Sequence, residues 1–177
     1  LNTQFEQYRI SEALMTVYTG FRDEFSSWLL EIIKPGFEQP IDRTTYDKTI
    51  YLFEEMLQLL HPFMPFITEE IWQNLRERKD GESIMVSVMP SPGKYDDNFL
   101  NTFENMKEVI AGIRTIRKQN NIAFKDTISL RVKSNDRYPL QFENIIRKMG
   151  NIQDVEMVND TVKGAWSFIC DTVEYFI

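Results

Sequence analysis

The feature that most constrains this chain is a run of helical periodicity over its first 80 residues. Apolar side chains recur at three- and four-residue steps from Phe5 to Val17, from Phe21 to Ile32, from Tyr46 to Leu60 and from Phe66 to Leu75. This spacing places apolar residues on one face of an α-helix. Four helices are therefore predicted, with Gly20 kinking or ending the first, and each must bury its apolar face against another.

Proline and capping residues predict where these helices begin and end. Pro62 closes the third helix, and Pro65 lies in the first turn of the fourth, where a missing N–H costs no hydrogen bond. Thr44 and Asp47 have the spacing of a capping box, in which each side chain satisfies a free backbone donor at the start of a helix. The third helix is therefore expected to begin at Thr44, and the fourth to extend to about Lys79.

The second half of the chain mixes helical and strand patterns. A breaker run at residues 90–93 separates it from the first half, helices are predicted over residues 98–119 and 139–149, and strands over residues 83–89, 128–133, 155–158, 165–169 and 173–177. The expected fold class is mainly α: a helical bundle followed by a small α+β subdomain. The expected boundaries are a bundle over residues 1–80, a strand and linker over residues 81–97, and the subdomain over residues 98–177.

Charge is unevenly distributed along the chain. The net charge of -7 argues against wholesale binding of nucleic acid, because phosphate binding requires Lys and Arg. Residues 98–150, however, hold 10 basic and 5 acidic side chains, whereas residues 1–97 hold 9 and 17. Such asymmetry indicates either a charged partner or a solvated basic face.

Several classes of function are excluded or disfavoured. No apolar run reaches the roughly 18 residues that a membrane span requires, and no Gly-rich phosphate loop is present. With one cysteine and one histidine the chain cannot assemble a Cys/His zinc set, and a single cysteine suits a reducing cytoplasm. His61 is interpreted as a helix-capping residue and Cys170 as a buried, inert thiol. The pairs at residues 54–55 and 69–70 are interpreted as solvated carboxylates, and the start on Leu1 suggests a piece of a longer protein.

Two groups of residues have the chemistry for binding RNA, and each also has a structural interpretation. On the predicted helix 98–119, Lys107, Arg114 and Lys118 line one stripe, with Arg117, Lys125 and the amides of Asn120 and Asn121 beside or just beyond it. These cations could contact phosphates, or could offset the helix dipole. The aromatic side chains at residues 18, 25 and 28 could stack on unpaired bases, or could belong to the core.

One segment resembles a known family. It reads Leu59-Leu60-His61-Pro62-Phe63-Met64-Pro65-Phe66-Ile67-Thr68-Glu69-Glu70-Ile71-Trp72. This segment is similar to the hallmark segment in the anticodon-binding domain of class I aminoacyl-tRNA synthetases for aliphatic amino acids. Within that group it most resembles the valine enzymes. Residues 18–35, 81–85 and 113–122 resemble further segments of the same family, and the resemblance is looser after about Lys133.

The chain also departs from that family. An aromatic residue is usual where Arg22 stands, and Cys-Asp is usual where Ser26 and Ser27 stand. The leading helix expected before Leu1, the two ATP-handling signatures, the editing domain and the coiled-coil arm expected after Ile177 are not in the sequence. The resemblance therefore implies a segment that carries no catalytic or metal-binding residue of its own.

The resemblance implies a tRNA-binding role within a cytoplasmic ligase. The parent enzyme would join valine to its tRNA using ATP and magnesium, while this segment would need no cofactor, contact no membrane, and have valine tRNA and the remainder of the synthetase chain as partners. The candidate tRNA contacts are Arg22, Phe25, Trp28, Arg114, Arg117, Lys118 and Lys125. Two alternatives remain open: the same domain of an isoleucine or related synthetase, and a non-enzymatic helical scaffold for protein interactions.

Overall fold

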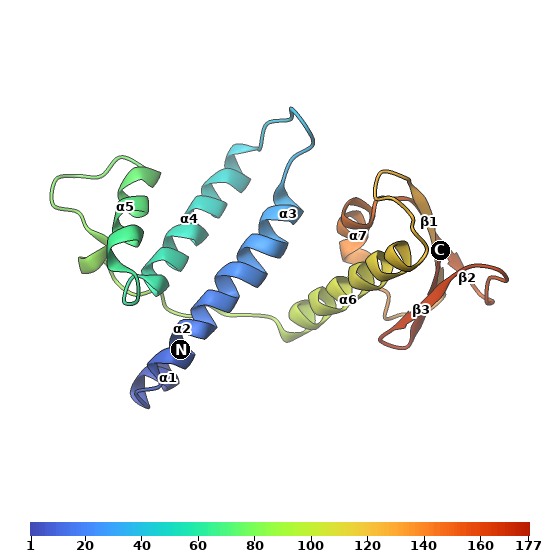
Figure 1. Ribbon diagram of the computed structural model, residues 1–177, viewed down its shortest axis with the longest axis horizontal. Helices are drawn as coiled ribbons and strands as arrows, with labels where there is room; N and C mark the ends of the chain where they lie inside the picture. The colour runs from blue at the N-terminus through green and yellow to red at the C-terminus, as the bar shows by residue number, and fades with distance from the viewer. The chain divides into compact units, whose positions relative to one another are not determined.

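A computed structural model describes residues 1–177 and divides the chain into two compact units. The helical unit comprises Leu1–Gly93 and the sheet unit comprises Lys94–Ile177 (Figure 1). A mainly helical chain with a small α+β part is thereby confirmed. None of its helices combines the length and the apolar character needed to span a bilayer.

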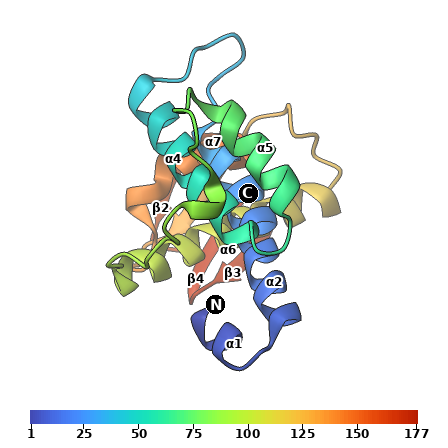
Figure 2. The same cartoon turned by 90° about the vertical axis from the view of Figure 1, so that its left-hand side faces the viewer.

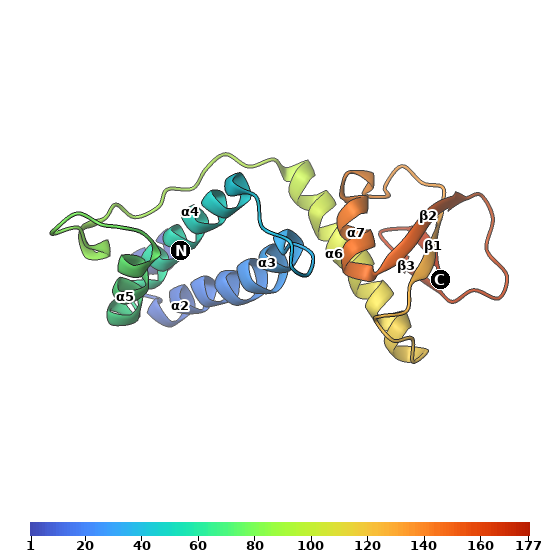
Figure 3. The ribbon, with the colours of Figure 1, turned by 90° about the horizontal axis from the view of Figure 1, so that it is seen from above.

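The helical unit is built around two long antiparallel helical segments. After the short helix α1 (Asn2–Glu6), one continuous segment comprises α2 (Ile10–Thr19), the π-helix η1 (Gly20–Leu29) and α3 (Leu30–Ile33). The second long segment, α4 (Arg43–Leu60), runs back beside the first (Figures 1 and 3). Next, α5 (Pro65–Leu75) packs against α4 (Figure 2), followed by the 3-10 turn η2 (Ile84–Val86).

The α-helix α2 ends at Thr19 with Gly20 as its cap residue, as predicted, but the chain stays helical beyond it. Gly20 keeps a right-handed helical conformation (φ -58°, ψ -43°), and the backbone widens from there into a π-helix. Ser26 and Ser27 donate their hydroxyls to the carbonyls of Phe21 and Arg22, five residues earlier, at 2.9 Å each. A second interruption, which was not predicted, lies at Tyr8, whose φ of 57° is left-handed and which separates α1 from α2.

Three expectations for this unit are wrong. The cap of α4 is Asp42, whose Oδ1 accepts from the Thr45 N–H at 2.9 Å, so the helix begins before the predicted Thr44. Helix α5 ends at Leu75, short of Lys79. Residues 83–89 form no strand, because the helical unit contains no strand with which they could pair; residues 84–86 form the 3-10 turn η2 instead.

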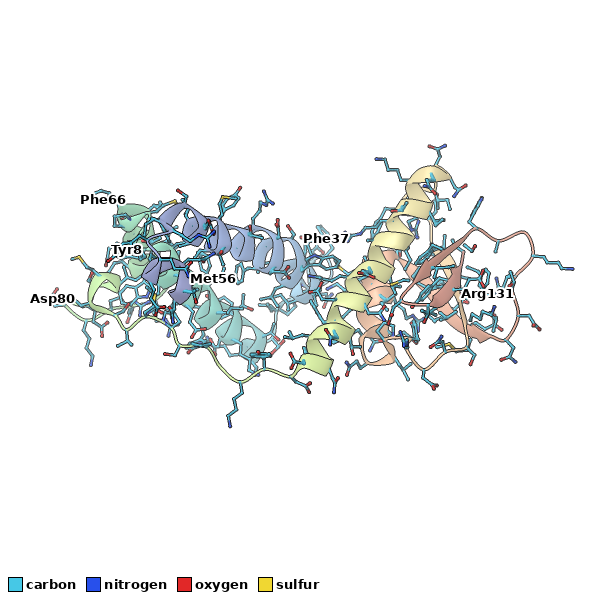
Figure 4. All side chains as sticks on the ribbon, turned by 90° about the horizontal axis from the view of Figure 1, so that it is seen from below. Tyr8, Phe37, Met56, Phe66, Asp80 and Arg131 are labelled. Atoms are coloured by element: carbon cyan, nitrogen blue, oxygen red, sulfur yellow. The ribbon has the colours of Figure 1, made fainter.

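The core of the helical unit is thin. Leu57, Trp72 and Ile84 form its buried cluster, joined by partly buried Phe53, Ile71 and Leu75. The rings of Phe21, Phe25 and Phe53 stack on one another with centroids 5.6 to 6.0 Å apart, which ties η1 to α4. Phe66 is 90% exposed and points away from α5 (Figure 4).

The sheet unit packs two helices on a four-stranded mixed sheet. Its elements are α6 (Asp97–Gln119), β1 (Ile128–Lys133), the 3-10 turn η3 (Leu140–Phe142), α7 (Glu143–Gly150), β2 (Ile152–Val158), β3 (Ser167–Cys170) and β4 (Val173–Phe176). The strand order is β2-β1-β4-β3, with β1 and β2 parallel across the connection through α7 and the other pairs antiparallel. Strand β2 begins three residues before its predicted start.

Helix α6 packs against the sheet along one buried face. Its stripe of Met106, Val109, Ile110 and Ile113 is fully buried, as are Leu130 and Val132 on β1 and Tyr175 on β4. Gly112 allows α6 to approach β3 closely, because a Cβ at that position would overlap the ring of Phe168. The C-terminal end of α6 is therefore fixed against the sheet.

Candidate nucleic-acid interface

The seven candidate tRNA contacts fall into two sets, one in each unit. Arg22, Phe25 and Trp28 lie on the π-helix η1. Arg114, Arg117 and Lys118 lie in the last two turns of α6, and Lys125 lies in the loop that follows.

Arg22 is an exposed cation that already has partners. Its Nε donates to Asp23 Oδ1 at 2.6 Å and its Nη2 donates to Asp23 Oδ2 at 3.0 Å, while its guanidinium lies 5.2 Å from the centroid of the Tyr18 ring. The hydrogen bonds to Asp23 raise the pKa of Arg22 and lower that of Asp23. A phosphate would share or displace this carboxylate, while Tyr18 keeps the guanidinium plane oriented.

Phe25 does not occupy the surface that stacking on a base requires. It is 6% exposed, and its ring packs against those of both Phe21 and Phe53. Trp28 is half-buried. Both side chains continue the three- and four-residue stripe of Phe21 and Ile32, which is the sequence signal that identifies them as core.

Arg117 is also buried rather than exposed. Its side chain is 4% exposed, and burial lowers the pKa of its guanidinium. The guanidinium donates to four backbone carbonyls: those of Ala123, Asp126, Gly150 and Asn151, at 2.9 to 3.2 Å. Arg117 thus joins α6, the loop after it and the end of α7. It is unavailable to a phosphate in this conformation.

The stripe on α6 contained the signal for this burial. Arg117 stands four residues after Ile113 and seven after Ile110, both fully buried, so it continues the apolar face toward the end of the helix. A long side chain at such a position can bury its methylenes and bring its donors to carbonyls at the edge of the core. Arg117 was predicted to contact tRNA from beside the basic stripe, a prediction that rested on its charge rather than on its position along the helix.

The remaining basic side chains of this region are at the surface. Arg114, Lys118 and Lys125 are exposed, and neither lysine forms an ion pair with a carboxylate. They are carried on a fixed helix end: the Ile122 N–H donates to Arg117 O at 2.9 Å, the Asn121 N–H donates to Lys118 O at 3.4 Å, and Asn121 is left-handed with φ 55°. These are the bonds of a Schellman motif.

The segment Leu59–Trp72, which carries the family resemblance, has a structural role here. The Thr68 hydroxyl lies 2.8 Å from Met64 O and forms a 2.7 Å hydrogen bond with His61 Nδ1. This pair ties the end of α4 to α5 across the turn. Trp72 then enters the core with Leu57. His61 therefore bridges two helices through its ring, rather than capping carbonyls as predicted.

Two acidic residues expected to be solvated are structural. Glu54 is only 12% exposed and pairs with both Arg76 and Arg78, and the Arg78 guanidinium stacks 3.4 Å from the centroid of the Trp72 ring. Glu69 accepts from Gln73, from the Ser83 hydroxyl and from the Ile84 N–H. Partial burial opposes ionisation of Glu69, but these hydrogen bonds outweigh it and lower its pKa. Glu54 and Glu69 were both predicted to be solvated because their partners at residues 76–84 are distant in sequence.

Cys170 is the buried thiol that the sequence predicts. Burial, reinforced by Glu108, raises its pKa to about 12, which suppresses the thiolate at neutral pH. No group of three or more His, Cys, Asp and Glu side chains is placed to hold a metal ion.

Comparison with known proteins identifies the family. The model of the anticodon-binding domain of tRNA ligases matches residues 1–133. Valine–tRNA ligases are similar along the whole chain: those of Parabacteroides distasonis (48% identical over 177 residues, 100% of this chain), Phocaeicola vulgatus (50% over 173 residues, 98%) and Thermotoga maritima (28% over 175 residues, 97%). The chain spans 20% of the length of each of these relatives.

The chain belongs to the anticodon-binding domain family of tRNA ligases. The resemblance to the valine enzymes, predicted from residues 59–72, is confirmed by relatives of that description that extend through the sheet unit to residue 177. This similarity favours the valine enzymes over the isoleucine and scaffold alternatives.

Proposed function

We propose that this chain is the tRNA-recognition region of a valine–tRNA ligase, and that its helical unit is an anticodon-binding bundle of the class I type. The observation that supports the proposal most directly is similarity to valine–tRNA ligases over the whole chain, across both units. The complete ligase would join valine to its tRNA in the cytoplasm, using ATP and magnesium. We assign those steps to parts of the ligase outside residues 1–177, and none to a residue of this chain.

Recognition in this proposal divides between base and phosphate contacts. Unpaired bases of an anticodon loop expose both their faces and their hydrogen-bonding edges, so a rigid protein surface can read them. Phosphate contacts set the register, whereas base contacts give identity. Exposed Arg22, Lys118 and Lys125 suit the phosphate contacts. Arg114, on the same helix as Lys118, is exposed as well. Buried Phe25 and Arg117 support the surface from within.

The acidic charge of the helical unit fits selective binding. Residues 1–93 have a net charge of -7, from 8 basic and 15 acidic side chains. Such a surface repels RNA except where cations or aromatic rings are exposed, which discriminates against unrelated RNA. Arg22 beside Tyr18 is the best-defined cation of this kind on η1, because both its plane and its charge are held by neighbours.

The proposal is tested by tRNA binding to the complete ligase. Filter binding should show tighter binding of valine tRNA than of the same tRNA with an exchanged anticodon. A protein-interaction scaffold would bind both equally and weakly, and that result would refute the proposal.

A matched pair of arginines tests the contact on η1. Arg22→Gln should weaken binding of valine tRNA several-fold and reduce the slope of log K against log salt by about one phosphate contact. Arg9→Gln is the control, because Arg9 is similarly exposed and also pairs with a carboxylate, that of Glu12 at 2.7 Å. Equal effects of the two substitutions would remove Arg22 from the interface.

A further inference from the structure

Phe124 is an aromatic side chain held at the surface by a rigid loop. It lies in the segment 120–127 between α6 and β1, and it is 60% exposed. An exposed ring of this size forgoes the stabilisation that its burial would give. The loop around it nevertheless fixes its position rather than turning it inward.

The backbone on both sides of the ring is bonded to the rest of the sheet unit. The Asn151 side-chain amide donates to the carbonyl of Phe124 itself at 2.6 Å, and Arg117 Nη1 donates to the carbonyls of Ala123 and Asp126, each at 2.9 Å. The Arg117 guanidinium also lies 5.7 Å from the centroid of the Phe124 ring. The ring is thus preorganised, so a ligand that stacks on it need not pay to order the loop.

Cations without carboxylate partners flank the ring in sequence. Lys125 is its immediate neighbour, and Lys118 lies on the last turn of α6; both are exposed. The nearest acidic side chain in sequence is Asp126, which is exposed and whose backbone carbonyl is the one that Arg117 binds. An aromatic face with adjacent cations is the combination that binds single-stranded nucleic acid, because bases stack on the ring and phosphates contact the cations.

We propose that Phe124 is a stacking platform for an unpaired base of the bound tRNA, with Lys118 and Lys125 contacting the neighbouring phosphates. This inference rests on the proposed function and deepens it, because it places a base contact in the sheet unit on a residue that charge and periodicity did not single out.

The aromatic character of Phe124 is tested in the complete ligase. Phe124→Leu keeps an apolar side chain but removes the π face, and it should weaken binding of valine tRNA between about fivefold and a hundredfold. Phe124→Trp retains a stacking surface and should bind within about twofold of the unchanged protein. Because the ring is exposed, neither substitution should shift the melting temperature appreciably.

Tyr95→Leu is the matched control. Tyr95 is 75% exposed and precedes α6, whereas Phe124 follows it, so the two rings lie at opposite ends of a 23-residue helix about 34 Å long. Lys94 precedes Tyr95 and Asp96 and Asp97 follow it, so the charges beside this ring sum to -1 and do not favour phosphate. Its substitution should leave tRNA binding unchanged.

The phosphate contacts are tested through salt dependence. Lys118→Gln combined with Lys125→Gln should reduce the slope of log K against log salt by about two contacts, while Lys163→Gln, an exposed lysine elsewhere in the same unit, should not change it. Competition with an isolated anticodon stem-loop and with an acceptor-arm minihelix identifies the part of the tRNA involved. Phe124→Leu should weaken binding of the fragment that supplies the stacked base and should leave binding of the other fragment unchanged.

The outcomes separate this inference from the function on which it rests. If the unchanged ligase does not prefer valine tRNA, both fall. If it does and Phe124→Leu binds equally well, only the stacking platform is refuted. If Phe124→Leu and Phe124→Trp are equally impaired, the ring acts through its shape and not through stacking, which also refutes the platform.

Discussion

The two units differ in what stabilises them. Of the twelve largest side chains that are fully buried, ten lie in the sheet unit and only Leu57 and Thr68 lie in the helical unit. The helical unit instead relies on polar ties between its elements, such as Glu54 with Arg78 and His61 with Thr68. A sheet covered by two helices encloses its apolar face, whereas a few helices in one layer cannot. Truncation of buried apolar side chains should therefore destabilise the sheet unit most, whereas loss of polar contacts should destabilise both units.

The largest expected effect comes from the apolar core of the sheet unit. Leu130 is fully buried in the middle of β1, between its neighbours β2 and β4. Leu130→Ala should lower the free energy of unfolding by about 2 to 5 kcal/mol, because it removes buried methyl groups and leaves a cavity. Hydrogen exchange resolved by peptide should show the loss mainly in residues 94–177.

Ile169→Ala on β3 is the control for this effect. Ile169 is 72% exposed, so its truncation should cost well under 1 kcal/mol. Comparable losses from Leu130→Ala and Ile169→Ala would show that the core assigned to the sheet unit does not determine its stability.

Arg117 should show the next largest effect, in the same unit but through polar contacts. Arg117→Met retains most of the volume of the side chain and leaves the carbonyls of residues 123, 126, 150 and 151 without their donors. The expected loss is about 2 to 3 kcal/mol by urea denaturation, since unsatisfied buried carbonyls are costly. Lys118→Met, one residue along on the exposed side, should change stability little, and an equal loss there would contradict the role of Arg117.

The sequence predicts most of this architecture, because hydrophobic periodicity reports directly on which face of an element is buried. It identifies the long helices and all four strands of the sheet, including β1 with its alternation of Leu130 and Val132. It fails at residues 83–89, where a strand-like composition has no partner strand. It also misses the π-helix, because an extra residue per turn depends on how η1 packs against α4.

The same limit applies to the candidate interface. Residue type alone predicts that an arginine binds phosphate, whereas the structure shows Arg117 bound to backbone carbonyls from two distant segments. Phe124 was not singled out at all, because a single aromatic residue in a loop has no periodicity that would show it to be exposed. The position of Arg117 on the apolar face of α6 indicates its burial, whereas the exposure of Phe124 depends on tertiary contacts that the sequence pattern does not report.

In the helical unit, the polar tie at Glu54 should have a smaller effect than Arg117. Glu54→Gln removes the charge that pairs with Arg76 and Arg78 while keeping the shape of the side chain. The expected loss is about 1 to 2 kcal/mol, because Arg78, only 13% exposed, is left without its counter-ion. Glu77→Gln, which changes an exposed side chain nearby, is the control. If Glu54→Gln and Glu77→Gln shift the midpoint of denaturation equally, the pairing of Glu54 contributes nothing to stability.

The smallest predicted effects are those of pH on stability. They should differ between the units, because carboxyl pKa values are lowered in the helical unit, whereas thiol and phenol pKa values are raised in the sheet unit. In the helical unit, hydrogen bonds from Thr45 lower the pKa of Asp42, and those from Gln73, Ser83 and Ile84 lower the pKa of Glu69 against partial burial. In the sheet unit, burial raises the pKa of Tyr138, Cys170 and Tyr175.

A carboxyl whose folded-state pKa is lowered stabilises the fold at neutral pH, and that contribution is lost as the pH falls below about 4.5, the ordinary value for Glu. A thiol or phenol whose folded-state pKa is raised contributes fully below its ordinary value, and that contribution is lost as the pH rises above about 9 to 10. The helical unit should therefore lose stability first in acid and the sheet unit first in alkali. Melting curves of variants that retain only Trp72 or only Trp166 would report on each unit separately.

Tyr175→Phe sharpens this last comparison, because the Tyr175 hydroxyl is buried and has no hydrogen-bond partner. Removing it breaks no bond, so the substitution should be neutral or slightly stabilising at pH 7. It should also make the stability of the sheet unit fall less steeply above pH 9, since one of the buried acids that resist ionisation is gone. An unchanged alkaline slope would mean that burial of Tyr175 does not oppose its ionisation, and the difference between the units would then rest on the other two groups alone.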